Sequence, residues 1–178
     1  PALHVPTTAT GMKRPFLLLS CLFLLTACGQ GDAVQLNTGQ AAPVFQTQRL
    51  GGGEARFPAD FAGKPLVIRF WADWCRYCEG EMKAIETVYQ GHRTQGVEVL
   101  AVNVGQDAPT VAAFARKIGV SYPLLLDEEA AVARQYGVQG LPTTYFVDAQ
   151  GVVRAKIVGE ADAAMPEPNE ILGHQATP

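Results

Sequence analysis

Apolar and polar positions along the chain switch between a period of two and a helical period, which predicts strands and helices in alternation. The run PLVIRFWA is apolar almost throughout and has strand length, so it predicts a central strand covered on both faces. The next segment carries Met82, Ile85, Val88 and Tyr89 at helical spacing. The expected elements are a hairpin at 44–50 and 54–57, strands at 65–72, 97–104 and 122–127, helices at 76–90, 107–119 and 127–136, and two closing strands within 143–158.

Turn and capping residues mark where these elements begin and end. Three consecutive glycines separate the two strands of the first hairpin. Asp107, with Pro109 in the first turn, opens a helix that Gly119 closes. Asp127 is expected to cap the following helix, and the sequence Asp-Ala-Gln-Gly to turn the last two strands. Strands that alternate with helices and end in a hairpin predict an α/β sheet with helices on its faces.

The first 28 residues resemble an export signal rather than part of this fold. Met12-Lys13-Arg14 supplies a positive start. The apolar run at 16–27 has the length of a signal-peptide core and is too short to span a bilayer. We therefore expect residues 12–27 to be a signal peptide and residues 1–11 to lie upstream of the true start. A buried core helix is the alternative.

The end of this run, Leu25-Thr26-Ala27-Cys28, resembles the lipobox of bacterial lipoproteins. That resemblance implies cleavage before Cys28 and acylation of this residue, which anchors a protein to a membrane. Gly29 stands where Asp would retain such a protein at the inner membrane, so the outer membrane is favoured if the cell is Gram-negative. Residues 29–43 are polar and lack periodicity, and they predict a flexible tether.

Composition narrows the possible functions. The 178 residues are 48% hydrophobic and 17% charged, which favours one globular domain over a disordered chain. The net charge of −3, without a basic cluster beyond Lys13-Arg14, makes nucleic acid an unexpected partner. After Gly159 the pattern fades, and prolines interrupt what would be a last helix, so residues 160–178 are predicted to be a weakly structured tail.

Cysteine chemistry carries the functional prediction. Of four cysteines, Cys21 would leave with the signal and Cys28 would carry lipid, so Cys75 and Cys78 remain as thiols in a compartment that permits disulfides. Cys75 lies where the central strand ends and a helix begins, and the positive end of that helix favours its thiolate. Cys78, one turn further, is expected to point inward and to close a disulfide with Cys75. This spacing provides one attacking and one resolving sulfur.

Three other roles fit these cysteines less well. A zinc site needs four ligands, but no second cysteine pair remains, and His92 and His174 have no ligand-like spacing to the first. A purely structural disulfide would close a loop of four residues and constrain the unfolded chain little. A peroxide-reducing cysteine would be expected to have Thr or Ser three residues before it, where Ala72 stands. Dithiol–disulfide exchange is therefore the favoured reaction.

The segments FWADWCRYCEGEM and GLPTTYFVDAQG together resemble the TlpA/ResA group, which are tethered thioredoxin-like thiol-disulfide oxidoreductases outside the cytoplasm. The resemblance covers about residues 42–159. It implies a thioredoxin-like domain at 44–159, with an N-terminal hairpin and a central helix–strand insertion. It also implies a cis Leu141–Pro142 peptide against the cysteine pair. The backbone around this bond, including Thr143, would pair with an incoming client chain.

The same resemblance assigns roles to single side chains. Trp74 would pack beside the sulfurs and offer surface to a partner, while Trp71 belongs to the core. Glu81 matches the active-site carboxylate of the group, which tunes the thiols or relays a proton, and a solvated helix glutamate is the alternative. Arg69 departs from the group, which usually has a small amide there. Because a buried arginine is costly unless paired, we expect Arg69 to meet Glu81 or Asp73.

These observations predict a lipid-anchored, extracytoplasmic thiol-disulfide oxidoreductase that acts as a monomer and needs no metal or organic cofactor. The resemblance implies that it reduces partner disulfides, such as those of haem-attachment cysteines in c-type cytochromes or of oxidised copper-site proteins. Electrons would then come from a membrane donor of the DsbD or CcdA kind. Two alternatives stay open: an oxidant that donates its disulfide, and a copper-delivery protein that binds metal through both thiolates and a histidine.

Overall fold

The computed structural model describes residues 1–4 and 35–160. Pro1–Asp32 and Ala33–Pro178 form separate units, and the described helices and strands lie in the second. The expected signal peptide, Cys28 and residues 161–178 of the expected tail lie outside the described residues. None of the described helices is long and apolar enough to cross a membrane.

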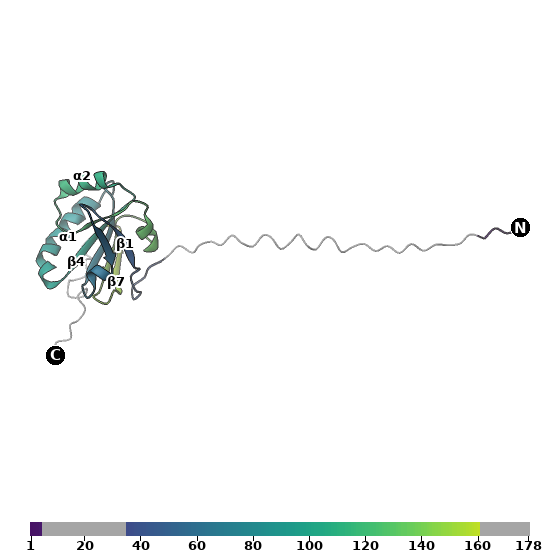
Figure 1. Ribbon diagram of the computed structural model, residues 1–178, viewed down its shortest axis with the longest axis horizontal. Coiled ribbons are helices and arrows are strands. Elements are labelled where there is room, and N and C mark those ends of the chain that lie inside the picture. Colours follow the sequence, from purple (N-terminus) through teal and green to yellow (C-terminus); the bar gives the residue numbers. More distant parts are fainter. Residues whose placement is uncertain (5–34, 161–178) are drawn as a thin grey trace, which may run out of the picture. The chain divides into compact units, whose positions relative to one another are not determined.

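The folded unit is a seven-stranded mixed sheet with helices packed on it (Figure 1), which confirms the α/β prediction. The strand order is β2-β1-β5-β4-β3-β6-β7. The pairs β3–β4 and β4–β5 are parallel and the others antiparallel. In chain order the elements are β1 (Phe45–Arg49), β2 (Glu54–Phe57), η1 (Ala59–Phe61), β3 (Leu66–Trp71), α1 (Cys78–His92), η2 (Arg93–Gln95), β4 (Glu98–Val104), α2 (Ala108–Ile118), β5 (Leu124–Asp127), α3 (Ala131–Gln135), β6 (Thr143–Val147) and β7 (Val153–Val158).

Strand β3 is buried along its whole length because both of its faces are covered. Side chains at alternate positions belong to two separate hydrophobic clusters. Leu66, Ile68 and Phe70 contribute to the cluster that also contains the buried residues of α3. Val67 and Trp71 contribute to the other cluster, which contains both cysteines and the buried residues of α1 and α2. The two long helices therefore share the face of the sheet on which the cysteines lie.

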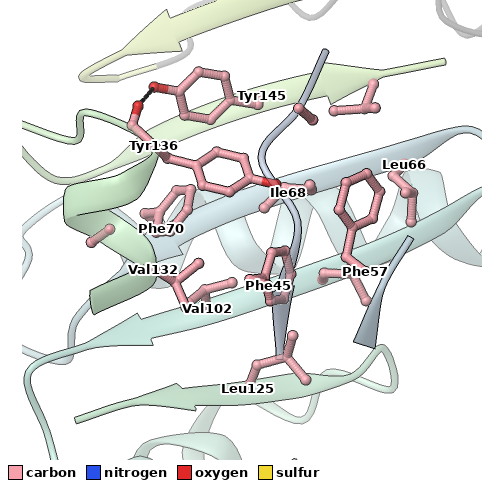
Figure 2. Close-up of a cluster of buried hydrophobic side chains, with 14 of the residues drawn as sticks. Phe45, Phe57, Leu66, Ile68, Phe70, Val102, Leu125, Val132, Tyr136 and Tyr145 are labelled. Carbon is pink, nitrogen blue, oxygen red and sulfur yellow. Dashed lines mark hydrogen bonds between the residues drawn. The ribbon is translucent and has the colours of Figure 1, made fainter. Parts of the chain in front are cut away.

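Aromatic side chains fill the opposite face of the sheet (Figure 2). Tyr145 and Tyr136 meet edge to face with ring centroids 5.4 Å apart, and the Tyr145 hydroxyl donates to the Tyr136 carbonyl at 2.6 Å. The Tyr136 hydroxyl donates to the carbonyl of Pro43 at 2.8 Å. Because these hydroxyls find acceptors, the large rings can be buried without leaving a polar group unpaired.

The packed domain begins before Val44, which corrects the predicted boundary of the tether at 29–43. Leu36 and Ala42 are buried, and Ala41 forms a β-bridge with Val152. The Gly39 amide donates to the Val153 carbonyl at 2.7 Å. This stretch is polar in composition, but two of its apolar side chains pack on the domain. Residues 35–43 therefore belong to the folded unit.

Helix caps mostly follow the prediction. The Asp107 carboxylate accepts the Thr110 amide at 3.0 Å, and Gly119 ends α2 in the left-handed conformation. The third helix begins later than expected, at Ala131. The Asp127 carboxylate nevertheless accepts two amides in its first turn, from residues 132 and 133, at 3.1 and 2.8 Å. Asp127 therefore caps α3 across an intervening turn.

Candidate active site

Cys75 and Cys78 form a disulfide at the junction between β3 and α1. Cys78 is the first residue of α1 and is fully buried, whereas Cys75 lies in the preceding turn and keeps 6% of its surface exposed. Their Cα atoms are 5.4 Å apart. The turn is held by backbone bonds from the Cys75 amide to the Ala72 carbonyl and from the Cys78 amide to the Cys75 carbonyl. Of the two cysteines, only Cys75 therefore keeps any exposed surface, and Cys78 points into the domain as the sequence predicted.

Arg69 lies under this junction and is buried, with 1% of its side chain exposed. One of its terminal nitrogens forms an ion pair with Glu81, and the other donates to the Thr144 hydroxyl at 2.9 Å. The expected partner Glu81 is confirmed. Asp73 instead bonds to Gln106. Through its contacts with Glu81 and Thr144, Arg69 joins β3 to the first turn of α1 and to β6.

Burial lowers the pKa of the Arg69 guanidinium, and the negative charge of Glu81 offsets part of this effect. Arginine is effectively always protonated in proteins. Arg69 and Glu81 therefore face each other as opposite charges, with 15% of the Glu81 side chain exposed. A cavity of about 60 Å³ borders both side chains and Thr144. The first turn of α1 carries two carboxylates, Glu79 and Glu81, and Glu81 is the one that is directed inward.

The other carboxylate of that turn, Glu79, is directed toward two lysines. It accepts from Lys83 at 3.0 Å and from Lys117, on α2, at 2.5 Å. Hydrogen bonds from Lys117 and Lys83 hold the pKa of Glu79 below its usual value. Lys83 and Lys117 thus compensate the negative charge of Glu79, which directly follows Cys78. This charge therefore opposes a thiolate at Cys75 less than the sequence alone suggests.

A polar network braces the turn that carries Cys75. The Gln106 amide group donates to the Asp73 carboxylate at 2.5 Å and accepts from the Asp73 backbone amide at 2.9 Å. Gln106 also accepts from the buried Asn103 at 2.9 Å, at the end of β4. Sequence reasoning missed Gln106, because nothing in its composition or spacing relates it to a turn 33 residues earlier. The network fixes the start of the cysteine turn to the neighbouring parallel strand.

The Pro142 segment lies beside the same junction. The Leu141–Pro142 peptide is cis, as expected from the resemblance. Leu141 packs against the cluster that contains both cysteines, and Pro142 is buried. Thr143 pairs with Phe70, near the end of β3, and its hydroxyl donates to the Gly140 carbonyl at 2.7 Å. The structure therefore brings the two sequence motifs together, although they lie more than 60 residues apart.

The two tryptophans of the motif have opposite surroundings. Trp71 is fully buried against Phe114, with ring centroids 4.8 Å apart, whereas Trp74 keeps 70% of its surface exposed. Ala72 is buried and contributes only its backbone to the turn of Cys75. Within residues 1–4 and 35–160, no cluster of three or more His, Cys, Asp or Glu is placed to hold a metal ion.

We expect Glu81→Gln to lower the free energy of unfolding by about 3 kcal/mol, because it leaves the buried Arg69 charge without a counter-charge. Glu79→Gln is the matched control on the same turn, and its lysine partners are half exposed or more. That change should cost much less, because the ion pairs of Glu79 with its two lysines are exposed to solvent. Urea unfolding of the oxidised protein measures both.

The double variant Arg69→Met/Glu81→Gln should be more stable than Glu81→Gln alone, because it also removes the stranded charge. Equal losses for Glu81→Gln and Glu79→Gln, or a double variant no more stable than Glu81→Gln, would show that Arg69 does not depend on this carboxylate.

Comparisons with known proteins identify the family of this chain. The model of the AhpC/TSA family matches residues 38–156. Thiol-disulfide oxidoreductase ResA from Geobacillus thermodenitrificans is 40% identical over 121 residues, which cover 68% of this chain and 69% of that protein. ResA from Bacillus subtilis is 29% identical over 162 residues, 86% of this chain and 90% of that protein.

A solved structure shows the same arrangement of elements. The crystal structure of a thiol:disulfide interchange protein of the thioredoxin family, from Chlorobium tepidum, matches with a TM-score of 0.61 and 25% identity. The match covers 71% of this chain and 89% of that one. It confirms the thioredoxin-like fold expected from the two motifs. The chain therefore belongs to the AhpC/TSA family and is a thiol-disulfide oxidoreductase with a thioredoxin-like fold.

Proposed function

We propose that the protein is a membrane-tethered, extracytoplasmic oxidoreductase that reduces disulfides of partner proteins through Cys75 and Cys78. The observation that carries this proposal is the unequal burial of the two sulfurs at the start of α1. Cys75, which follows the exposed Trp74 in the sequence, keeps 6% of its surface exposed, and Cys78 is fully buried. This arrangement suits an attacking thiolate with an internal resolving thiol.

The proposed reaction starts from the reduced protein. The Cys75 thiolate attacks one sulfur of the client disulfide, a mixed disulfide forms, and the other client sulfur leaves as a thiolate. The Cys78 thiol then loses its proton and attacks the Cys75 sulfur, which releases the second client thiolate. The client gains two electrons and becomes a dithiol, while Cys75 and Cys78 become the disulfide seen in the structure.

Two features support the assignment of Cys75 as the nucleophile. The positive end of α1 lies next to its sulfur and favours a thiolate. The nearby carboxylate Glu79 is compensated by Lys83 and Lys117. We assign Glu81, which follows Cys78 by one helical turn, the relay of the proton from the Cys78 thiol. Arg69 is then the positioning residue that holds this carboxylate.

The two sulfurs should behave differently when each is removed. A Cys78→Ser variant should accumulate a mixed disulfide between Cys75 and its client, because the resolving step is lost. Cys75→Ser should accumulate far less, because the remaining sulfur is buried. Non-reducing electrophoresis and mass spectrometry of trapped complexes measure both. More complex with Cys75→Ser than with Cys78→Ser would reverse the assignment.

We propose the reducing direction because the chain is similar to proteins named ResA and because its motifs resemble the tethered TlpA/ResA group. Clients of this reaction would be haem-attachment cysteines of c-type cytochromes or oxidised copper-site proteins. A membrane donor of the DsbD or CcdA kind would return electrons to Cys75 and Cys78. The protein would act on these partners as a monomer.

The reduction potential of the Cys75–Cys78 couple tests this direction. We expect a value near about −270 mV, the range of thioredoxin, which suits a reductase fed by a membrane donor. Equilibration in dithiothreitol or glutathione buffers, followed by alkylation and mass measurement, gives the value. A potential near about −120 mV would identify an oxidant and reverse the proposed electron flow.

We also propose that acylated Cys28 tethers the domain outside the cytoplasm, on the outer membrane in a Gram-negative cell. The support is the signal-like run at 16–27, the lipobox-like residues before Cys28, and Gly29 after it. Cys28→Ala should therefore move the protein from the membrane to the soluble fraction without changing its redox activity in vitro. Fractionation followed by a thiol-exchange assay checks both. If this variant still pelleted with membranes, lipidation of Cys28 would not be the anchor.

A further inference from the structure

Exposed apolar side chains gather around the disulfide. Among residues 35–160, the exposed large hydrophobic residues are Val44, Trp74, Tyr77 and Val158. Trp74 and Tyr77 flank the attacking cysteine in sequence, with 70% and 40% of their surface exposed. Val158 pairs with Thr143, which directly follows Pro142, and is 62% exposed. Apolar surface therefore flanks the disulfide both on the cysteine turn and on the Pro142 side, as expected of a surface that contacts a partner.

Arg76 adds a positive charge to this surface. Its side chain is exposed, and its guanidinium carbon lies 5.6 Å from the centroid of the Tyr77 ring. This stacking favours a defined direction for a long side chain that would otherwise rotate freely. The residue lies between the two cysteines in the sequence and directly follows the attacking one, so its charge belongs to the same turn.

Among the residues that the structure describes, the ion pairs around the site do not include Arg76. Four basic groups, Arg69, Arg76, Lys83 and Lys117, face three carboxylates, Asp73, Glu79 and Glu81. Glu81 pairs with Arg69, Glu79 pairs with both lysines, and Asp73 is bonded to the neutral Gln106. No ion pair joins Arg76 to a carboxylate within the described residues. The site thus keeps a local excess of one positive charge, in a chain whose net charge is −3.

We propose that Arg76, held by Tyr77, selects client segments that carry Asp or Glu within about three residues of the attacked cysteine, together with an apolar side chain. An exposed guanidinium binds a carboxylate with two parallel hydrogen bonds, and the neighbouring aromatic rings provide the apolar contact. The inference rests on the proposed exchange at Cys75 and adds the class of client. It predicts that charge next to the client cysteine changes the rate of the first attack.

Two synthetic peptides test the proposal. They share a Leu beside one cysteine, which is joined to 2-mercaptoethanol as a neutral mixed disulfide, and differ only in Asp or Lys two residues away. The reduced full chain is mixed with each peptide, and formation of the Cys75–Cys78 disulfide is followed by alkylation and mass. The readout is the ratio of the two rate constants within one variant. Any general change in cysteine reactivity cancels in that ratio.

The unmodified protein should react about threefold to tenfold faster with the Asp peptide at low salt, and the ratio should fall as salt is added. Arg76→Gln should bring the ratio close to one, and Arg76→Glu should invert it. Arg93→Glu is the matched control, because it makes the same charge change at an exposed residue just beyond the far end of α1. A helix of 15 residues places that position about 22 Å from the start of α1. Arg93→Glu should leave the ratio unchanged.

The outcomes separate the two proposals. If both peptides react at equal rates, or if Arg76→Glu leaves the ratio unchanged, selection by Arg76 is overturned while exchange at Cys75 stands. If Arg93→Glu changes the ratio as much as Arg76→Glu, the effect belongs to the net charge of the protein and the proposal also fails. If neither peptide oxidises the reduced protein, the proposed exchange reaction itself is overturned.

Discussion

The pairing of the buried Arg69 guanidinium is the interaction on which the arrangement of the site depends. A cation with 1% of its side chain exposed is stable only when nearby groups compensate its charge. Its partners come from two elements that both carry parts of the site. Glu81 belongs to the helix that begins at Cys78, and Thr144 lies two residues after Pro142. One side chain of β3 thus ties the cysteine helix and the Pro142 segment to the same central strand.

This anchoring leaves the two sulfurs in different environments. Cys78 lies in the hydrophobic layer between α1 and the sheet, and its helix is fixed from below by Arg69. Cys75 lies in a short turn held by the side chain of Gln106, which bonds to both the backbone and the carboxylate of Asp73. The difference in burial between the sulfurs therefore follows from packing around them and not from the two-residue spacing alone.

Much of the fold could be predicted from the sequence because its signals are local. The central strand, both long helices and the final hairpin follow from apolar periodicity and turn residues. The two-residue spacing of the cysteines, together with their place between a strand and a helix, indicated the redox pair. A charge on a doubly covered strand requires a counter-charge within reach, so the partner of Arg69 could be narrowed to Glu81 or Asp73, of which the structure has Glu81.

The features that sequence reasoning missed depend on contacts between distant or polar residues. Gln106 bonds to Asp73 across 33 residues, and a half-buried and an exposed polar side chain carry no periodic signal of such a contact. Leu36 and Ala42 pack on the domain from a stretch whose Gly and Gln content is typical of a linker. In each case the residue contacts a partner that is distant in the sequence, and only the tertiary structure shows which partner that is.

Membership of the AhpC/TSA family does not by itself fix the reaction, and the surroundings of Cys75 decide it. Ala72 offers no hydroxyl three residues before Cys75, and its carbonyl accepts the Cys75 amide at 3.2 Å. Cys78 is close enough to Cys75 to form the disulfide of the structure. In an exchange reaction, Cys78 therefore attacks a mixed disulfide at Cys75 from within the same chain, at a high effective concentration. Because this second step is available whichever client is bound, selection among clients has to occur at the first attack. In the selection that we propose, the residues that decide this step are Arg76 with Tyr77 and the exposed Trp74, whereas the buried Arg69–Glu81 pair holds the cysteine helix in place.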